Sequence, residues 1–288
     1  MKLLRYGPIG LEKPAALDAE GIIRDLSSIV TDIAGTTLSR NSLAKLTKID
    51  LSSLPAVPSD VRIGPCVGSV GNFVAVGLNY IDHALETNTP IPEEPVLFNK
   101  HTSCISGPND PICLLKDSEK TDWEVEIAFV IGEPAYHVRE ADALSVIAGF
   151  CVCHDVSERA FQIERGGQWT KGKSGPTFGP LGPWLVTPDE IGDVQNLDLW
   201  LDVNGQRMQT GSTSKMIFPI ATLVSYISRF MRLMPGDVIT TGTPPGVGLG
   251  MKPPVFLKAG DVVELGIDGL GTQRQIVTAF GARDHQET

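Results

Sequence analysis

Short apolar runs separated by glycine and proline are the feature that most restricts what this chain can fold into. From about residue 69 onward, runs such as NFVAVGLNY, EVEIAFVIG, IAGFCVCHD and DVVELGIDGLG recur, and the 288 residues include 30 Gly and 21 Pro. Runs this short, rich in β-branched residues and bounded by turn residues, are typical of β-strands. Asn204-Gly205 and Asp268-Gly269 are turn-forming dipeptides. The sequence therefore predicts a chain built mostly of short strands.

Helical patterns are few, and this bounds the fold class. One covers residues 157–164, where Ser157 can cap a helix, and another lies within 212–234 and begins near Pro219. Many strands with few helices indicate a β-rich α+β fold. Residues 54–68 are rich in Pro, Gly and Val and are typical of a linker. We predict a small N-terminal domain with its linker over 1–68, a main domain over 69–282, and a polar C-terminal tail over 283–288.

Charge and cysteine content indicate the partners and the compartment. The net charge is −10 and the basic residues are scattered, whereas phosphate backbones bind clustered Lys and Arg. No apolar run reaches the roughly 18 residues that span a bilayer, and MKLLRYGPIG lacks the apolar core of a signal peptide. Five cysteines without C-x-x-C spacing are typical of reduced thiols. We expect a cytoplasmic protein with no nucleic-acid or membrane partner, in which Cys151 and Cys153 are small core residues.

Two glutamates one residue apart, Glu124 and Glu126, lie in the apolar run WEVEIAFVIG. Residues i and i+2 of a strand point to the same face, so both carboxylates project together. Asp155 ends a second apolar run, where a strand would give way to a helix. Three carboxylates brought together form a hard-oxygen site suited to a magnesium-type ion, and the thiolate or His-x-x-x-His patterns that zinc prefers are missing. The alternative is a solvated strand face, the commoner use of an E-x-E pattern.

His83 and Glu86 stand three residues apart, in a stretch where Asp82 could begin a short helix. Two side chains at this spacing are adjacent on one helical face. A carboxylate orients the imidazole beside it, and such a pair suits general-base chemistry. The alternative is a surface pair. Residues 87–95 contain three prolines, cannot continue the helix and could form a covering loop.

Further polar residues follow Asp155. Arg159 and Gln162 share one face of the predicted helix, and the Gly/Pro-rich stretch GGQWTKGKSGPTFGPLGPW carries Lys173. Such a loop tolerates close approach of its backbone to a ligand, and a lysine there could stabilise an oxyanion; an ordinary surface lysine is the alternative. TGTPPGVGLG is not a P-loop, and GKSGP is not a serine-hydrolase elbow. We interpret the former as a tight turn that places Thr243 near a pocket.

Several motifs, taken in chain order, resemble those of the fumarylacetoacetate hydrolase family: GLNY-x-x-H-x-x-E, E-x-E, D-x-x-x-R-x-x-Q, W-T-x-x-K-S and T-G-T-P-x-G-V-G. The resemblance runs from about residue 73 to residue 269. It implies that the main domain is a catalytic mixed β-sandwich roll, preceded here by a small N-terminal domain. It also implies a homodimer.

The resemblance implies a role for each matching residue. The metal ligands would be Glu124, Glu126 and Asp155. The catalytic residues would be His83, Glu86, Lys173 and Gln162. The substrate contacts would be Tyr80, Arg159 and Thr243. The metal would be Mg²⁺, with Mn²⁺ as the alternative. One departure concerns Leu78, since many small members of the family have G-R-N-Y where this chain has GLNY. Whatever that arginine contributes to substrate recognition is absent here.

The resemblance also implies an activity, the metal-dependent hydrolysis of a C–C bond in a 2,4-diketo acid. The long forms with SERAFQ-x-ERGGQWTKGKS and GTPPGVGLG resemble enzymes that cleave 2,4-diketo-3-deoxy-L-rhamnonate or L-fuconate to pyruvate and a hydroxy acid such as lactate. Alternatives within the family are a decarboxylase, a tautomerase or isomerase, and a ureidoglycolate lyase that use the same metal site. A non-catalytic protein that binds a sugar acid or a metal is a third class.

Overall fold

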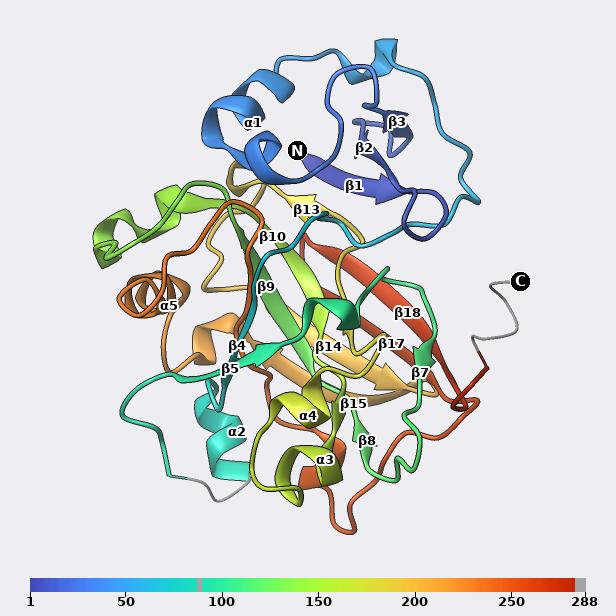
Figure 1. Ribbon diagram of the computed structural model, residues 1–288, viewed down its shortest axis with the longest axis vertical. Coiled ribbons are helices and arrows are strands. Elements are labelled where there is room, and N and C mark those ends of the chain that lie inside the picture. Colours follow the sequence, from blue (N-terminus) through green and yellow to red (C-terminus); the bar gives the residue numbers. More distant parts are fainter. Residues whose placement is uncertain (87–89, 283–288) are drawn as a thin grey trace.

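A mixed nine-stranded sheet is the largest layer of the protein, whose computed structural model describes residues 1–86 and 90–282 (Figure 1). Most neighbouring strands are antiparallel, whereas β16 and β4 are parallel. Strand β9 lies between β10 and β16, and every residue of it is buried, so both of its faces are covered. In order across the sheet, the strands are β3 (Ile23–Asp25), β2 (Lys13–Leu17), β1 (Lys2–Tyr6), β13 (Leu185–Val186), β10 (Ile147–His154), β9 (Val125–Ile131), β16 (Val238–Thr240), β4 (Phe73–Gly77) and β5 (Val96–Lys100).

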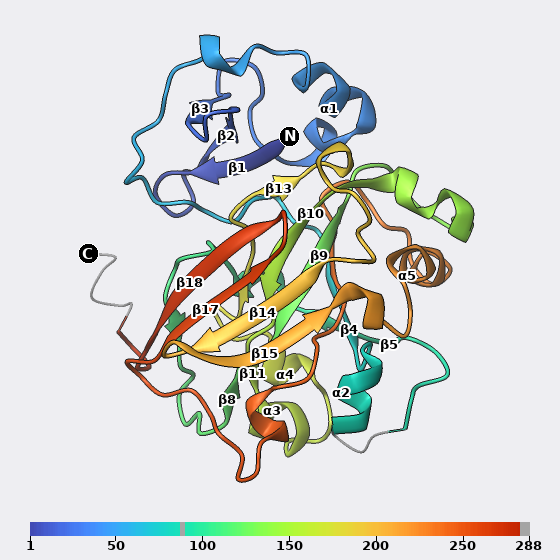
Figure 2. The same ribbon diagram turned by 180° about the vertical axis from the view of Figure 1, so that it is seen from behind.

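A five-stranded sheet packs against the first one (Figure 2). Strands β9 and β10 contact β14, β17 and β18 across the interface. The predicted turns at Asn204-Gly205 and Asp268-Gly269 join β14 to β15 and β17 to β18, and positive φ angles at Asn204 (52°), Gly205 (75°) and Gly269 (77°) explain those residue types. In order, the strands are β15 (Gln206–Ser212), β14 (Asp198–Val203), β17 (Val262–Ile267), β18 (Gly271–Thr278) and β7 (Ile112–Cys113).

In the described residues, two short strand pairs, five α-helices and seven short 3-10 helices complete the fold. Helices α2, α3 and α4 lie at one end of the molecule, far from α1 (Figures 1 and 2). In the described residues no helix is long and apolar enough to cross a membrane. The short pairs are β11 (Ser157–Glu158) with β8 (Thr121–Asp122) and β12 (Gly179–Pro180) with β6 (Ile105–Ser106); the helices are α1 (Arg40–Leu46), α2 (Ile81–Glu86), α3 (Arg159–Ile163), α4 (Thr170–Lys173) and α5 (Ile220–Ile227).

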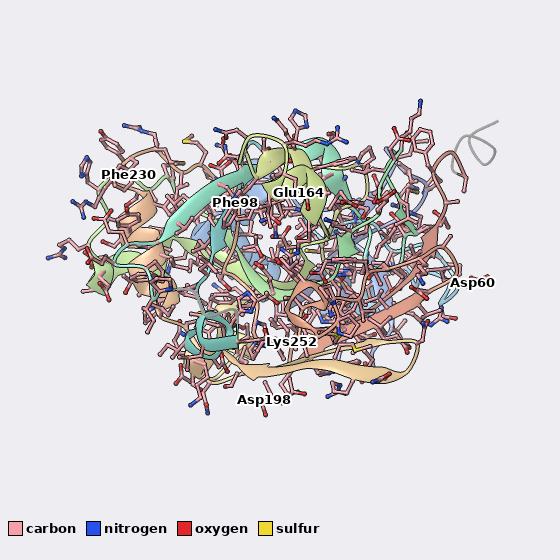
Figure 3. All side chains as sticks on the ribbon, turned by 90° about the horizontal axis from the view of Figure 1, so that it is seen from below. Asp60, Phe98, Glu164, Asp198, Phe230 and Lys252 are labelled. Atoms are coloured by element: carbon pink, nitrogen blue, oxygen red, sulfur yellow. The ribbon has the colours of Figure 1, made fainter. Side chains whose placement is uncertain are left out.

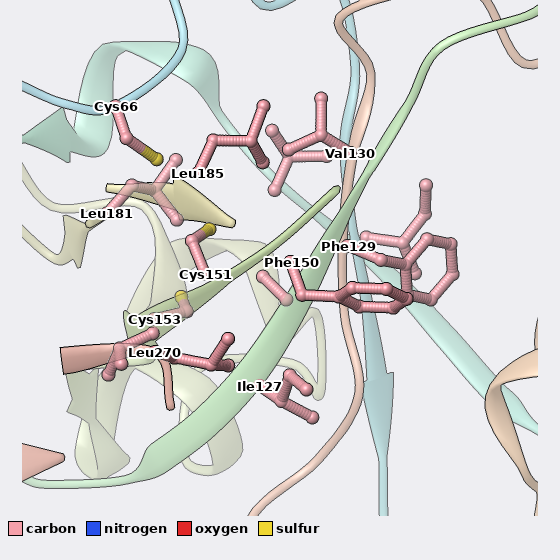
Figure 4. Packing of buried hydrophobic residues seen from close by; sticks show 14 of the residues in the cluster. Cys66, Ile127, Phe129, Val130, Phe150, Cys151, Cys153, Leu181, Leu185 and Leu270 are labelled. Atoms are coloured by element: carbon pink, nitrogen blue, oxygen red, sulfur yellow. The ribbon is translucent and has the colours of Figure 1, made fainter. Parts of the chain in front are cut away.

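The core lies between the two sheets and along β10 (Figure 4). Phe129 and Phe150 pair across β9 and β10, and Cys151 and Cys153 are fully buried small core residues, as predicted. The thiol of Cys66, from the N-terminal part of the chain, lies within hydrogen-bonding reach of Cys151. The N-terminal segment is therefore joined to the main core by side-chain packing.

The predicted β-rich α+β class is confirmed, and so are helices near 157–164 and after Pro219. The predicted cap at Ser157 is wrong. Ser157 belongs to β11 and donates its hydroxyl to the carbonyl of Asp155, while Glu158 accepts from the N–H of Ala160 and begins α3. Glu158 has a longer side chain than Ser157 and directly precedes α3, so its carboxylate reaches the first turn of that helix.

Strand β1 pairs with β13, so the N-terminal strands continue the main sheet by hydrogen bonds. The division near residue 69 stays a prediction about folding units. The predicted tail over 283–288 lies outside the described residues, as does the 87–89 part of the predicted covering loop.

Candidate active site

Three carboxylates converge where β9 begins and β10 ends. The antiparallel register pairs Glu126 with Cys153, and the N–H of Asp155 donates to the carbonyl of Glu124 over 3.0 Å. One oxygen from each of Glu124, Glu126 and Asp155 lies within 4.8 Å of the others. The three residues are only 5%, 2% and 1% exposed, respectively. The solvated-face alternative is therefore wrong, because β9 is buried on both faces.

Three buried cations surround these carboxylates. Nζ of Lys173 lies 2.7 Å from Oε2 of Glu124 and 2.7 Å from Oδ2 of Asp155. Nζ of Lys100 lies 2.6 Å from Oδ1 of Asp155, and Nη2 of Arg159 lies 2.7 Å from Oε1 of Glu124. Lys173 is 2% exposed, so the surface-lysine alternative is wrong. Burial without these partners would be prohibitive for the carboxylates.

The pKa values of the two glutamates are shifted in opposite directions. Burial raises the pKa of Glu126 well above its usual range, and the carboxylates of Asp155 and Glu124 raise it further. Burial alone would also raise the pKa of Glu124, but Lys173 and Arg159 outweigh it and hold that pKa well below its usual range. Glu126 is therefore the carboxyl group whose ionisation the surrounding cations do not balance.

The donor set fits a hard divalent cation. Counting Asp122, which binds Arg159, four carboxylates face three cations (Lys100, Arg159 and Lys173), so the cluster has one negative charge too many when Glu126 is ionised. Carboxylate oxygens are the ligands that Mg²⁺ and Mn²⁺ prefer. A divalent ion held by Glu124, Glu126 and Asp155 would reverse the sign to one excess positive charge.

The predicted His83–Glu86 pair is formed on α2. Nδ1 of His83 lies 3.2 Å from Oε2 of Glu86, and the N–H of Gly246 donates to both Glu86 oxygens over 3.1 and 3.2 Å. Burial would raise the pKa of Glu86, but these hydrogen bonds lower it overall. His83 is only 8% exposed, so the surface-pair alternative is wrong for the imidazole. The ionised carboxylate fixes the orientation of the ring.

A cavity of about 250 Å³ brings most of the predicted site residues together. It lies on the side of the molecule seen in Figure 3, where Phe98, which lines it, and Glu164, next to the lining residue Ile163, are labelled. Its polar lining consists of His83, Glu124, Glu126, Asp155, Arg159, Gln162, Lys173 and Thr243.

Of two predicted substrate contacts, Thr243 lines the cavity with its hydroxyl held by the protein, whereas Tyr80 is not in the described lining. The hydroxyl of Thr243 donates to the carbonyl of Val125 over 2.9 Å and accepts from Gln209 over 2.8 Å, which fixes the predicted turn against β9. Tyr80 is completely buried, and the described lining of the cavity does not include it. Burial raises the pKa of Tyr80 well above its usual range, and the charge of Glu126 adds to this.

Sequence reasoning missed two charged residues of the site. Lys100 ends the apolar strand β5, and its ammonium also donates to the carbonyl of Lys173. Asp122 accepts from Nε of Arg159 over 2.8 Å and from the N–H groups of Gly248 and Leu249 over 2.7 and 3.0 Å. The D-x-E-x-E spacing is a signal for Asp122, whereas an apolar run that ends in lysine is too common to point to Lys100.

Comparisons with known proteins agree with this arrangement. The sequence profile "Fumarylacetoacetate (FAA) hydrolase C-terminal" matches residues 72–278. A protein of Burkholderia multivorans, named provisionally as a hydrolase, is 61% identical over 280 residues, which are 97% of this chain and 99% of the relative.

Solved structures with the same fold include three enzymes. Fumarylacetoacetate hydrolase from Exiguobacterium antarcticum has a TM-score of 0.87 and 36% identity, covering 97% of this chain and 99% of that one. 5-Carboxymethyl-2-hydroxymuconate delta-isomerase from Mycobacterium smegmatis has a TM-score of 0.77 and 34% identity, and the match covers 98% of this chain and 100% of that one. Maleylpyruvate hydrolase from Sphingobium sp. SYK-6, in complex with manganese(II) and pyruvate, has a TM-score of 0.80 and 26% identity. The match covers 97% of this chain and 100% of that one.

The fold and the site define a β-rich α+β protein with a buried three-carboxylate centre, flanked by cations and a His–Glu pair. The profile match covers more than two thirds of the sequence and falls on the residues that build this centre. The chain belongs to the fumarylacetoacetate hydrolase family, whose members compared above are hydrolases and an isomerase.

Proposed function

We propose that this protein is a Mg²⁺-dependent hydrolase that cleaves a C–C bond of a 2,4-diketo acid, with Mn²⁺ as an alternative metal. The observation that carries the proposal is a single cavity that holds the three carboxylates, the His83 imidazole and the Lys173 ammonium. The maleylpyruvate hydrolase with manganese(II) and pyruvate supports both the metal and the product class. As the particular substrate we propose 2,4-diketo-3-deoxy-L-rhamnonate or L-fuconate, cleaved to pyruvate and lactate, by a cytoplasmic homodimer.

The charge of the site supports an anionic substrate. With a divalent ion held by Glu124, Glu126 and Asp155, the cluster, counted without the His83–Glu86 pair, carries one excess positive charge, which a monoanionic 2-oxo acid neutralises. When bound, the ion supplies Lewis-acid polarisation of the substrate's oxygens.

The residues of the chain account for the attack of water. Because Nδ1 of His83 is paired with Glu86, its Nε2 is the atom that accepts a proton from water. A positioned general base of this kind contributes roughly 10²- to 10⁴-fold to the rate. The resulting hydroxide adds to the C4 carbonyl of R–CO–CH₂–CO–COO⁻.

In the proposed reaction, Lys173 and Gln162 stabilise the oxyanion at C4. Lys173 uses two of its three N–H donors on Glu124 and Asp155, and Gln162 accepts from Arg159 through its carbonyl oxygen. One ammonium N–H and the amide nitrogen of Gln162 are left for the substrate, and each such donor is worth roughly 10²- to 10³-fold. The C3–C4 bond then breaks, R–COO⁻ forms, and pyruvate leaves as its enolate and takes up a proton.

A coupled assay for pyruvate tests the proposal. We expect the protein with Mg²⁺ to release pyruvate from at least one of a panel of 2,4-diketo acids that includes the two sugar-derived compounds. EDTA or Glu124→Ala should abolish release, because either removes the ion or one of its ligands. Pyruvate release that persists in EDTA, or none from the whole panel, would contradict it.

An isomerase is the second candidate, because the structure of an isomerase with 34% identity covers 98% of this chain. Isomerisation needs no attack of water. His83→Ala should then leave isomerisation of a hydroxymuconate-type substrate intact, whereas it should abolish C–C hydrolysis.

A further inference from the structure

The cavity is polar in one part of its lining and apolar in the remainder. A 2,4-diketo acid places its carboxylate and two carbonyl groups against the charged residues, so its acyl tail must lie along the remainder. We call these residues the apolar wall: Val76, Leu78, Phe98, Ile163, Trp169, Val247 and Leu249.

The apolar wall is fixed by close packing. A Cβ atom at Gly77 would lie 2.5 Å from Cζ3 of Trp169, so only glycine at the end of β4 lets the indole lie there. Trp169 in turn packs edge-to-face on Phe98 with the ring centroids 5.2 Å apart. These contacts join β4, β5 and the segment before α4 into one rigid apolar surface.

Leu78 occupies its place at a conformational cost. Its φ angle is +51°, in the left-handed region that leucine seldom adopts. The next residue holds it there: the side-chain nitrogen of Asn79 donates to the carbonyls of Phe218 and Thr241 over 3.1 and 2.9 Å, and its side-chain oxygen accepts from the N–H of Phe218 over 2.8 Å. The fold thus holds an apolar side chain in the cavity wall despite the unfavourable backbone.

The cations of the described lining are already paired. Arg159 binds Asp122 and Glu124, and Lys173 binds Glu124 and Asp155. A carboxylate at the far end of a substrate would therefore lie against apolar side chains, with no unpaired Lys or Arg in the described lining to receive it.

From these contacts we infer that the substrate is a 2,4-diketo acid whose acyl tail is uncharged and ends in an apolar group, and that Leu78 is a residue that sets this specificity. The inference rests on the proposed function and narrows it. It excludes diketo diacids. It accommodates the methyl end of a 6-deoxy sugar-derived diketo acid.

The test compares two substrates with the same carbon chain, 2,4-dioxoheptanoate and 2,4-dioxoheptanedioate, in the pyruvate assay with Mg²⁺. We expect kcat/KM for the monoacid to exceed that for the diacid by about 100-fold or more. Leu78→Arg should lower this ratio by about 10-fold or more, because it supplies a cation. Leu78→Met is the matched neutral control and should leave the ratio within about threefold. Ile163→Arg, at a residue that is 53% exposed, repeats the test if Leu78→Arg does not fold.

The outcomes separate the inference from the proposed function. Equal or better turnover of the diacid, or a ratio that neither arginine variant changes, would overturn the inference and leave the function standing. Failure of both substrates to react, together with failure of the whole panel of 2,4-diketo acids, would overturn the function. In that case calorimetric binding of 2-oxoheptanoate and 2-oxoheptanedioate, with Mg²⁺ present, decides the inference. Tighter binding of the monoacid supports it, and equal binding or no binding overturns it.

Discussion

Replacing Glu126 by Gln should stabilise the metal-free protein while destroying its response to Mg²⁺. Burial and two neighbouring carboxylates raise the pKa of Glu126 above the value of 4.5 expected for an unfolded chain. A raised folded-state pKa means that stability is fully present below pH 4.5 and is lost as the pH rises towards the folded-state pKa. At neutral pH the metal-free protein therefore bears a cost at this residue.

The size of that cost is bounded by protonation. At pH 7 the cost cannot exceed the free energy of protonating the Glu126 carboxylate, because the folded protein can take up a proton instead. The difference between pH 7 and the unfolded-chain pKa of 4.5 is 2.5 pH units, which at 1.36 kcal/mol each gives about 3.4 kcal/mol. At pH 5 the same bound is only about 0.7 kcal/mol. A glutamine keeps an oxygen that can accept from the N–H of Gly242, now 2.8 Å from Oε2, and from the hydroxyl of Thr240. We expect Glu126→Gln to raise the free energy of unfolding by about 1–3 kcal/mol at pH 7 and by less than about 0.7 kcal/mol at pH 5.

Urea unfolding in EDTA at both pH values measures this difference. A thermal shift with Mg²⁺ then measures the loss of metal binding, because the variant lacks one of the three carboxylates. Glu264→Gln is the matched control, since that carboxylate lies on β17 with a side chain that is 43% exposed. A lower stability of metal-free Glu126→Gln at pH 7, or an unchanged Mg²⁺ shift, would refute the reasoning.

Three further substitutions test other parts of the site. Glu86→Gln should lower kcat by roughly 10²-fold and change KM little, because Glu86 orients the base rather than the substrate; a change in KM alone in steady-state assays would make α2 a binding element. Burial lowers the pKa of His154 to about 4, so its stabilising effect is full above pH 6.5 and is lost as the pH falls towards 4. Urea unfolding should show that this fall of about 3 kcal/mol is missing in His154→Gln, and identical pH profiles would contradict it. Asp122→Asn should cost about 3 kcal/mol in the free energy of unfolding, because it leaves the buried Arg159 without a full partner; an unchanged urea midpoint would show that Glu124 alone suffices.

The parts of the site that follow from local sequence were predictable. The i, i+2 spacing of Glu124 and Glu126 places them on one face of a strand wherever that strand lies, and the i, i+3 spacing of His83 and Glu86 works in the same way on α2. That Asp155 joins the glutamates was a hypothesis based on its place at the end of an apolar run, and the motif order added to it. Asp155 is brought to the glutamates by the pairing of β9 with β10, which the local sequence around Asp155 does not reveal.

Features that depend on distant pairing could not be predicted from the sequence. Lys100 meets Asp155 across 55 positions of sequence, and an apolar run that ends in lysine is equally compatible with a solvated strand end. The nine-stranded sheet includes β1 to β3 because β13, a strand of two residues, pairs with both β1 and β10. A strand so short has too little periodicity to be found in the sequence.

The origin of the oxygen in the product acid tests the central claim most directly. The reaction is run with Mg²⁺ and a neutral-tailed 2,4-diketo acid in H₂¹⁸O, and the acid derived from the acyl tail is analysed by mass spectrometry. If water attacks the C4 carbonyl as proposed, we expect this acid to form in equal amount with pyruvate and to carry ¹⁸O in its carboxylate. Loss of CO₂, a rearranged substrate with no cleavage, or an acid without ¹⁸O would contradict it.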